Sequence, residues 1–190
     1  MRRSLTFALL TLLVAESVSP ATVAAPTFDE LISRAESVFV GEVVDVRSAW
    51  LNSRSGRAIV TDVTFSIERT LKGPSSVRRT LEFLGGTVGD HTLRVTGIPE
   101  FKVGDRDVLF VSDSGRPMSP LVGVMFGRFR IFQDPRTGGA AVRTFDGRPL
   151  ATLAEVGSQG PPSVVTPQRT LSLDQFLGAI DGKVRALARR

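Results

Sequence analysis

Apolar and polar residues alternate along much of the chain, and this alternation predicts a protein built mainly from β-strands. In the clearest stretch, residues 59–68, the series Ile59, Thr61, Val63, Phe65 and Ile67 is apolar except for Thr61, and most of its neighbours are polar. A period of two places one face of a strand against a core and the other against water. Similar runs predict five more strands, at residues 37–46, 80–84, 107–111, 120–132 and 140–145.

Two of these strands depart from simple alternation. Residues 37–46 carry apolar side chains on both faces, with Val38, Val40, Val44 and Val46 on one face and Phe39 and Val43 on the other. Apolar residues on both faces indicate a central or strongly curled strand. In residues 120–132 the alternation changes phase at Gly127-Arg128. One inserted residue would produce that change, so we predict a β-bulge there.

Helical patterns occur at both ends of the strand region. Thr27 and Glu30 have the spacing of a capping box and predict a short helix that runs to about Ala35. Residues 169–188 predict an amphipathic helix, capped by Ser172 or Thr170 and docked on the β-domain. Its apolar stripe comprises Leu173, Phe176, Leu177, Ile180, Val184 and Leu187.

The first 24 residues have the features of a secretory signal peptide. Arg2 and Arg3 form a basic start, and an apolar stretch of about a dozen residues follows, too short to cross a bilayer. Small residues at signal-peptidase spacing come next, in residues 19–24. We therefore expect an exported protein, periplasmic or extracellular, without an integral membrane span.

The remaining chain is expected to form one main domain. About 165 residues suit a single domain. We predict a small closed or partly open antiparallel barrel, OB-like, over residues 27–150, because closure protects strand edges. A β-sandwich is the alternative. Residues 151–168 are rich in Gly, Pro and Ser and predict a flexible segment that crosses to the C-terminal helix.

Composition narrows the chemistry. The chain has no cysteine, one histidine, no tyrosine and one tryptophan, and its formal net charge of +5 is scattered except at residues 183–190. Thiol catalysis and thiolate metal sites are therefore excluded. A nucleic-acid binder would cluster its basic residues and interleave aromatic ones. We expect no nucleic acid, no metal and no cofactor.

The segment from Gly85 to Gly104 is the strongest candidate for a functional site. It holds five glycines and the single histidine between two predicted strands, and long structured insertions of this kind often bind ligands or partners. Packing against the domain is the alternative role for its apolar residues. The candidate partner-binding residues are Trp50, Leu93, Arg94, Val95, Ile98 and Phe101.

Three functions stay open on the sequence alone. The leading hypothesis is an exported, non-enzymatic module that binds a protein or an envelope component through this segment. The second is a hydrolase that uses Asp90 and His91, although no nucleophile motif accompanies them. The third is a structural, envelope-associated protein held by its basic C-terminus.

Several stretches resemble a group of exported bacterial proteins of unknown function. They are residues 35–43, residues 61–65 leading to Leu71-Lys72-Gly73, Gly85-Gly86 with residues 95–101 and Gly104-Asp105, Gly127-Arg128-Phe129, and residues 173–177. More distantly, the start of the domain is similar to the OB-like barrels of netrin-type modules and tissue inhibitors of metalloproteases. That resemblance implies a barrel and a protease-binding role. Those inhibitors place a cysteine on the target's zinc, so their mechanism does not transfer to a chain without cysteine.

Overall fold

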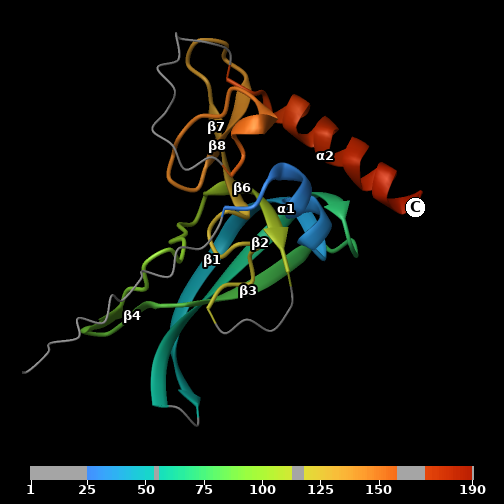
Figure 1. Ribbon diagram of the computed structural model, residues 1–190. Coiled ribbons are helices and arrows are strands. Elements are labelled where there is room, and N and C mark those ends of the chain that lie inside the picture. Colours follow the sequence, from blue (N-terminus) through green and yellow to red (C-terminus); the bar gives the residue numbers. More distant parts are fainter. Residues whose placement is uncertain (1–24, 54–55, 113–117, 158–169, 190) are drawn as a thin grey trace, which may run out of the picture.

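The computed structural model describes residues 25–53, 56–112, 118–157 and 170–189 (Figure 1). The expected signal peptide and most of the expected flexible segment therefore lie outside the described residues. Of that segment, residues 151–157 are described. They contain the short 3-10 turn Leu153–Glu155 and the buried Val156.

The protein is mainly β, with a six-stranded antiparallel sheet and two α-helices. The strand order is β3-β2-β1-β6-β7-β8, and β4 and β5 form a separate two-stranded hairpin. The sheet is open, because β3 and β8, its two outer strands, are not paired with each other. The elements are α1 Phe28–Arg34, β1 Ser37–Ser53, β2 Gly56–Lys72, β3 Arg78–Leu84, β4 Gly86–Val88, β5 His91–Leu93, β6 Arg106–Val111, β7 Arg128–Gln133, β8 Ala140–Thr144 and α2 Leu173–Ala188.

The prediction that the first strand is central is confirmed, since β1 lies between β2 and β6. Its two faces enter different cores. Val38 and Val40 pack beneath the two helices, whereas Phe39 and Val43 pack with β2 and β3 on the opposite face. The expected position of Val46 is wrong: a register shift between Val43 and Asp45 reverses the phase, so Val46 joins the second core.

The predicted long strand over residues 120–132, with its bulge at Gly127-Arg128, is also wrong. Leu121 forms a single bridge to Val111, and the chain then turns through Gly123 and Val124, both with positive φ, at 66° and 68°. The strand begins only at Arg128. The change of phase in the sequence therefore marks the end of a turn.

Both helices begin as their capping residues predict. Thr27 and Glu30 form a full capping box on α1. On α2 the N-cap is Ser172 rather than Thr170, and Gln175 completes a second capping box. The apolar stripe of α2 is buried against the first core, and Lys183 forms an ion pair with Asp29 of α1.

Lys72 joins the end of β2 to the end of α1. Its Nζ donates to the carbonyl oxygens of Ile32 and Ala35 at 2.7 and 2.5 Å. The last carbonyls of a helix have no partner within it, and a cation near them also meets the negative end of the helix dipole. Burial lowers the pKa of Lys72 below its ordinary value.

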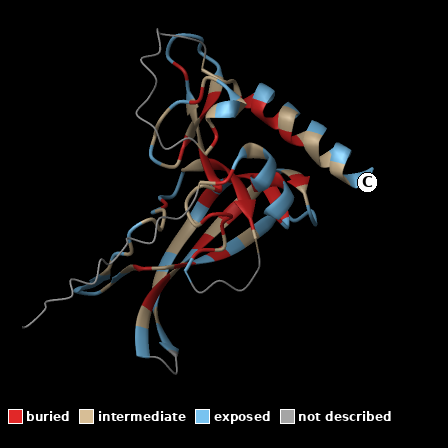
Figure 2. Ribbon diagram, in the orientation of Figure 1, coloured by how far each residue is buried: buried red, intermediate tan, exposed pale blue. Residues whose placement is uncertain are grey.

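β1 and β2 are each 17 residues long and run beyond the rest of the sheet as a two-stranded arm (Figure 1). The end of this arm is largely exposed, while the strands are buried where they meet β3, β6 and the helices (Figure 2). Among the helices that the structure describes, none combines the length and apolarity that crossing a membrane requires.

Candidate functional site

A cavity of about 310 Å³ lies between the β1–β2–β3 surface and the segment Gly85–Phe101, which forms its roof. Its floor includes Val46, Ser48, Thr61, Val63 and Phe83. The roof contributes five of the six predicted partner-binding residues, namely Leu93, Arg94, Val95, Ile98 and Phe101. The glycine-rich segment and the core strands thus enclose one site.

The double glycine lets the roof cross close above the floor. Gly85 and Gly86 have φ of 107° and 129°, which L side chains rarely adopt. A Cβ on Gly86 would lie 2.2 Å from Thr61 Oγ1 and 2.4 Å from Ser48 Oγ. The Gly85 N–H donates to the Ile59 carbonyl at 2.7 Å. Only glycine permits this crossing at residue 86.

A directed chain of hydrogen bonds lies at that crossing. Thr61 Oγ1 donates to the Gly85 carbonyl oxygen at 2.6 Å. A hydroxyl has one proton, so the 2.8 Å contact between Ser48 and Thr61 requires Ser48 to donate. Ser48 Oγ in turn accepts from the Thr87 N–H at 3.4 Å. Both hydroxyl protons are used, and the floor therefore offers a ligand acceptor lone pairs rather than hydroxyl donors.

Phe101 fixes the far end of the roof in the second core. Its ring lies 5.5 Å from that of Phe65 and 4.9 Å from that of Phe83, centroid to centroid. The Arg128 guanidinium carbon lies 3.9 Å from the Phe101 ring centroid. Such aromatic and cation–π contacts add to the burial of apolar area. Phe101 therefore packs as a core residue while one part of it lines the cavity.

Arg128 ties the roof to the sheet from below. Its side chain is 4% exposed, and it bonds the fully buried Asp107 through Nε and Nη2, both at 3.0 Å. Nη2 also reaches Asp105 at 2.8 Å, and Nη1 donates to the Glu100 carbonyl oxygen at 2.6 Å. One guanidinium thus connects Asp107 of β6, and Asp105 just before that strand, to the roof backbone.

The two carboxylates differ in acidity. Burial raises the pKa of Asp107, and the contact with Arg128 opposes that rise. Partial burial also disfavours the charged form of Asp105, but the Lys102 N–H and Arg128 outweigh it and hold the pKa of Asp105 below its ordinary value. Asp105 is thus held ionised at the base of the roof.

The rim of the cavity carries one charge of each sign. Arg94 Nε lies 3.8 Å from Glu100 Oε1, and the two side chains are 82% and 79% exposed. An exposed pair at this distance contributes little to stability. The pair therefore adds little to the stability of the roof and places one charge of each sign at the mouth of the cavity.

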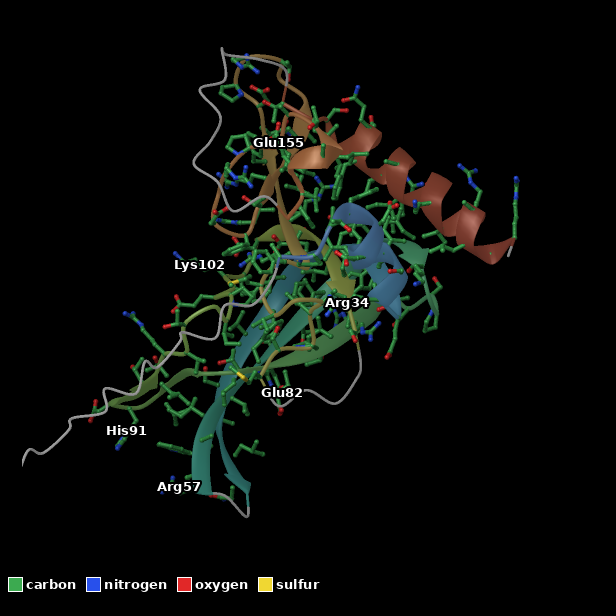
Figure 3. The ribbon with its side chains drawn as sticks, viewed as in Figure 1. Arg34, Arg57, Glu82, His91, Lys102 and Glu155 are labelled. Atoms are coloured by element: carbon green, nitrogen blue, oxygen red, sulfur yellow. The ribbon has the colours of Figure 1, made fainter. Side chains whose placement is uncertain are left out.

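Trp50, the sixth predicted residue, lies outside the cavity, where the arm meets the β4–β5 hairpin. Its ring centroid is 5.4 Å from that of His91, edge to face, and the Arg57 guanidinium lies 4.2 Å from the Trp50 ring. Figure 3 shows His91 and Arg57 on these two neighbouring extensions. Within the described part of the chain, no hydrogen bond links His91 to Asp90 or to a hydroxyl group.

Sequence reasoning missed the floor of the cavity and the arginine beneath it. Ser48 lies beyond the predicted strand at residues 37–46, and Thr61 is a polar residue within the apolar series of residues 59–68, so the sequence marks neither as a site residue. Asp105 and Asp107 flank Arg106 at the start of a predicted strand, and two such acids are a usable signal for a buried cation. No group of three or more metal-ligating side chains occurs among the residues that the structure describes.

No family model, no curated protein and no solved structure matches this chain.

Proposed function

We propose that the protein is an exported, non-enzymatic binding module that holds part of a protein or envelope component in the cavity beneath Gly85–Phe101. The observation that carries this proposal is the roofed cavity itself, with its mixed apolar and polar lining and charged rim. Its volume of about 310 Å³ is at the lower end of the usual range for ligand pockets. That size suits one or two side chains of a partner better than a large cofactor.

The open antiparallel sheet is compatible with a finer proposal, a partly open OB-like barrel. In that class of fold the exposed sheet face and its adjoining loops commonly bind ligands. The cavity occupies a comparable place, between the face of β1 to β3 and the long connection that follows β3. Fold analogy alone does not assign function, so the proposal depends on the cavity.

The test is to capture a partner from the exported proteins of the native cell, first with the unmodified protein and then with a variant that carries a charge in the cavity. Val95→Asp places a carboxylate on the half-buried roof and should abolish capture. Val77→Asp is the matched control, because Val77 is 80% exposed and does not line the cavity. Equal capture by both variants would refute the proposal.

The enzyme alternative is tested by the same preparation. His91 contacts the ring of Trp50, and a catalytic base needs a positioned nucleophile within hydrogen-bond reach. We expect His91→Ala to retain partner capture. Hydrolysis of an envelope substrate that His91→Ala abolishes would instead establish the hydrolase.

A further inference from the structure

The edge of β1 is free along the part of the strand that lines the cavity. At the base, β6 pairs with β1 as far as Glu42, and Val43 exchanges backbone hydrogen bonds with Gly104 and Asp105. Beyond Val43, the described residues supply β1 with backbone partners only from β2. In an antiparallel pair, alternate residues direct N–H and C=O away from their neighbour. These groups are thus open to another strand.

The free edge has two ends. The backbone of Gly104 and Asp105 closes it at Val43, and the contact between Trp50 and His91 narrows it near the tip. About five residues, 45–49, lie between, or roughly 16 Å of strand. Within this stretch Gly86 and Thr87 cross above the Ser48 side chain, which leaves the backbone edge of β1 unpaired. An extended peptide of that length is the structure that matches a row of unpaired backbone donors and acceptors.

The same stretch of β1 forms one wall of the cavity. Val46 and Ser48 both line it. Side chains of an added strand alternate between the two faces, as those of β1 do. Every second side chain of a peptide beside Val46 and Ser48 would therefore face the cavity, where the partly buried Leu93, Val95 and Ile98 of the roof give it apolar surface.

Charge around the edge favours an uncharged peptide. Arg94 pairs with Glu100 on the rim, and Arg47 pairs with Asp45 on β1 itself at 2.8 Å. Charges of both signs are present, and each already has an oppositely charged neighbour. A charged peptide side chain would meet a like charge beside each opposite one, while an uncharged segment disturbs neither pair.

We propose that an extended, uncharged segment of a partner protein adds as a strand to the edge of β1 at residues 45–49 and inserts one apolar side chain into the cavity. This inference rests on the proposed function, since it names what enters the site. Backbone pairing supplies affinity, and the cavity selects the side chain.

The probe is a displayed library of random heptapeptides, selected on the protein without residues 1–24. Selected peptides should share one apolar position within an uncharged stretch. N-methylation of their amides, one at a time, should weaken binding at least tenfold at alternate positions and little at the positions between, because only one set faces β1. Amide exchange in β1 should slow with the same alternation when the peptide is bound.

The cavity variants separate this inference from the proposed function. Val95→Asp should weaken peptide binding at least tenfold and Val77→Asp should not. Strand addition is wrong if Val95→Asp abolishes capture of the native partner while no heptapeptide binds, or if N-methylation shows no period of two. If peptides bind with that period but Val95→Asp does not weaken capture of the native partner, then only the proposed function is refuted.

Discussion

Replacement of Arg128 by methionine tests whether one buried cation holds the cavity roof in place. Methionine keeps much of the aliphatic packing and removes the guanidinium. The variant loses the paired contacts to Asp107, the contact to Asp105 and the hydrogen bond to the Glu100 carbonyl. It also loses the cation–π contact with Phe101. The roof and the strands beneath it are then joined by apolar contacts and the remaining backbone bonds.

The expected cost follows from burial. Removing one partner of a buried ion pair costs about 3–5 kcal/mol, because the other charge stays buried and unpaired. Asp107 is fully buried and Arg128 is 4% exposed, so this range applies. The remaining contacts are not additive with it, and we expect about 4 kcal/mol in total. Domains have about 5–15 kcal/mol of stability, so the variant should remain folded with a small margin.

The assay is urea unfolding followed by far-ultraviolet circular dichroism, with the fluorescence of Trp50 as a local probe of the arm. Adding Asp107→Asn to Arg128→Met removes the unpaired negative charge and should recover at least half of the lost stability. In the single variant the unpaired Asp107 should have a raised pKa. Its folded state should therefore gain stability as pH falls and lose it as pH rises. A loss under about 1 kcal/mol, or no recovery in the double variant, would refute the reasoning.

Three further changes test other parts of the structure. Gly86→Ala should cost about 1–3 kcal/mol from its backbone conformation alone, plus the clash with Thr61, whereas Gly89→Ala, with positive φ and open space, should cost less in the same urea assay. Lys72→Met should cost about 1–2 kcal/mol and lower the thermal midpoint, since it removes a charged donor from the end of α1. The pKa of Asp105 is lowered in the folded protein. The ionised carboxylate therefore stabilises the fold at pH values above its ordinary pKa, and this stabilisation is lost as pH falls through the lowered pKa. Asp105→Asn should thus flatten the change in unfolding free energy between pH 5 and pH 3.

Local patterns predicted the elements whose cause is local. The capping box at Thr27 sets the start of α1, and strict alternation sets the buried face of β2 at Val63 and Phe65. The arm extends beyond the predicted strand at residues 37–46, because residues 47–53 mix polar and apolar side chains without a regular alternation. Val124 shows a second limit. A non-glycine residue with positive φ reverses the chain inside an apolar run, and tertiary contacts decide that conformation.

The site was predicted on one side only. Leu93, Val95 and Ile98 stood out because apolar residues are unusual in a glycine-rich connection. Ser48 and Thr61 did not stand out, because the sequence around a hydroxyl residue on a strand is the same whether that residue faces solvent or lies beneath a covering segment. Only the crossing of Gly86 above them, fixed by the three-dimensional fold, turns these hydroxyls into the floor of a cavity.

The glycine-rich segment meets two opposing structural requirements. It must lie close to β1 and β2 at Gly86, where no side chain fits, and be held at its other end by Phe101 and Arg128. Between these anchors, residues 93–98 are partly buried or exposed. A segment needed solely for packing would gain stability by closing onto the partly buried Val46. The segment is instead anchored at both ends and raised in the middle, so an opening remains beside the free strand edge. Binding of an extended partner requires this arrangement.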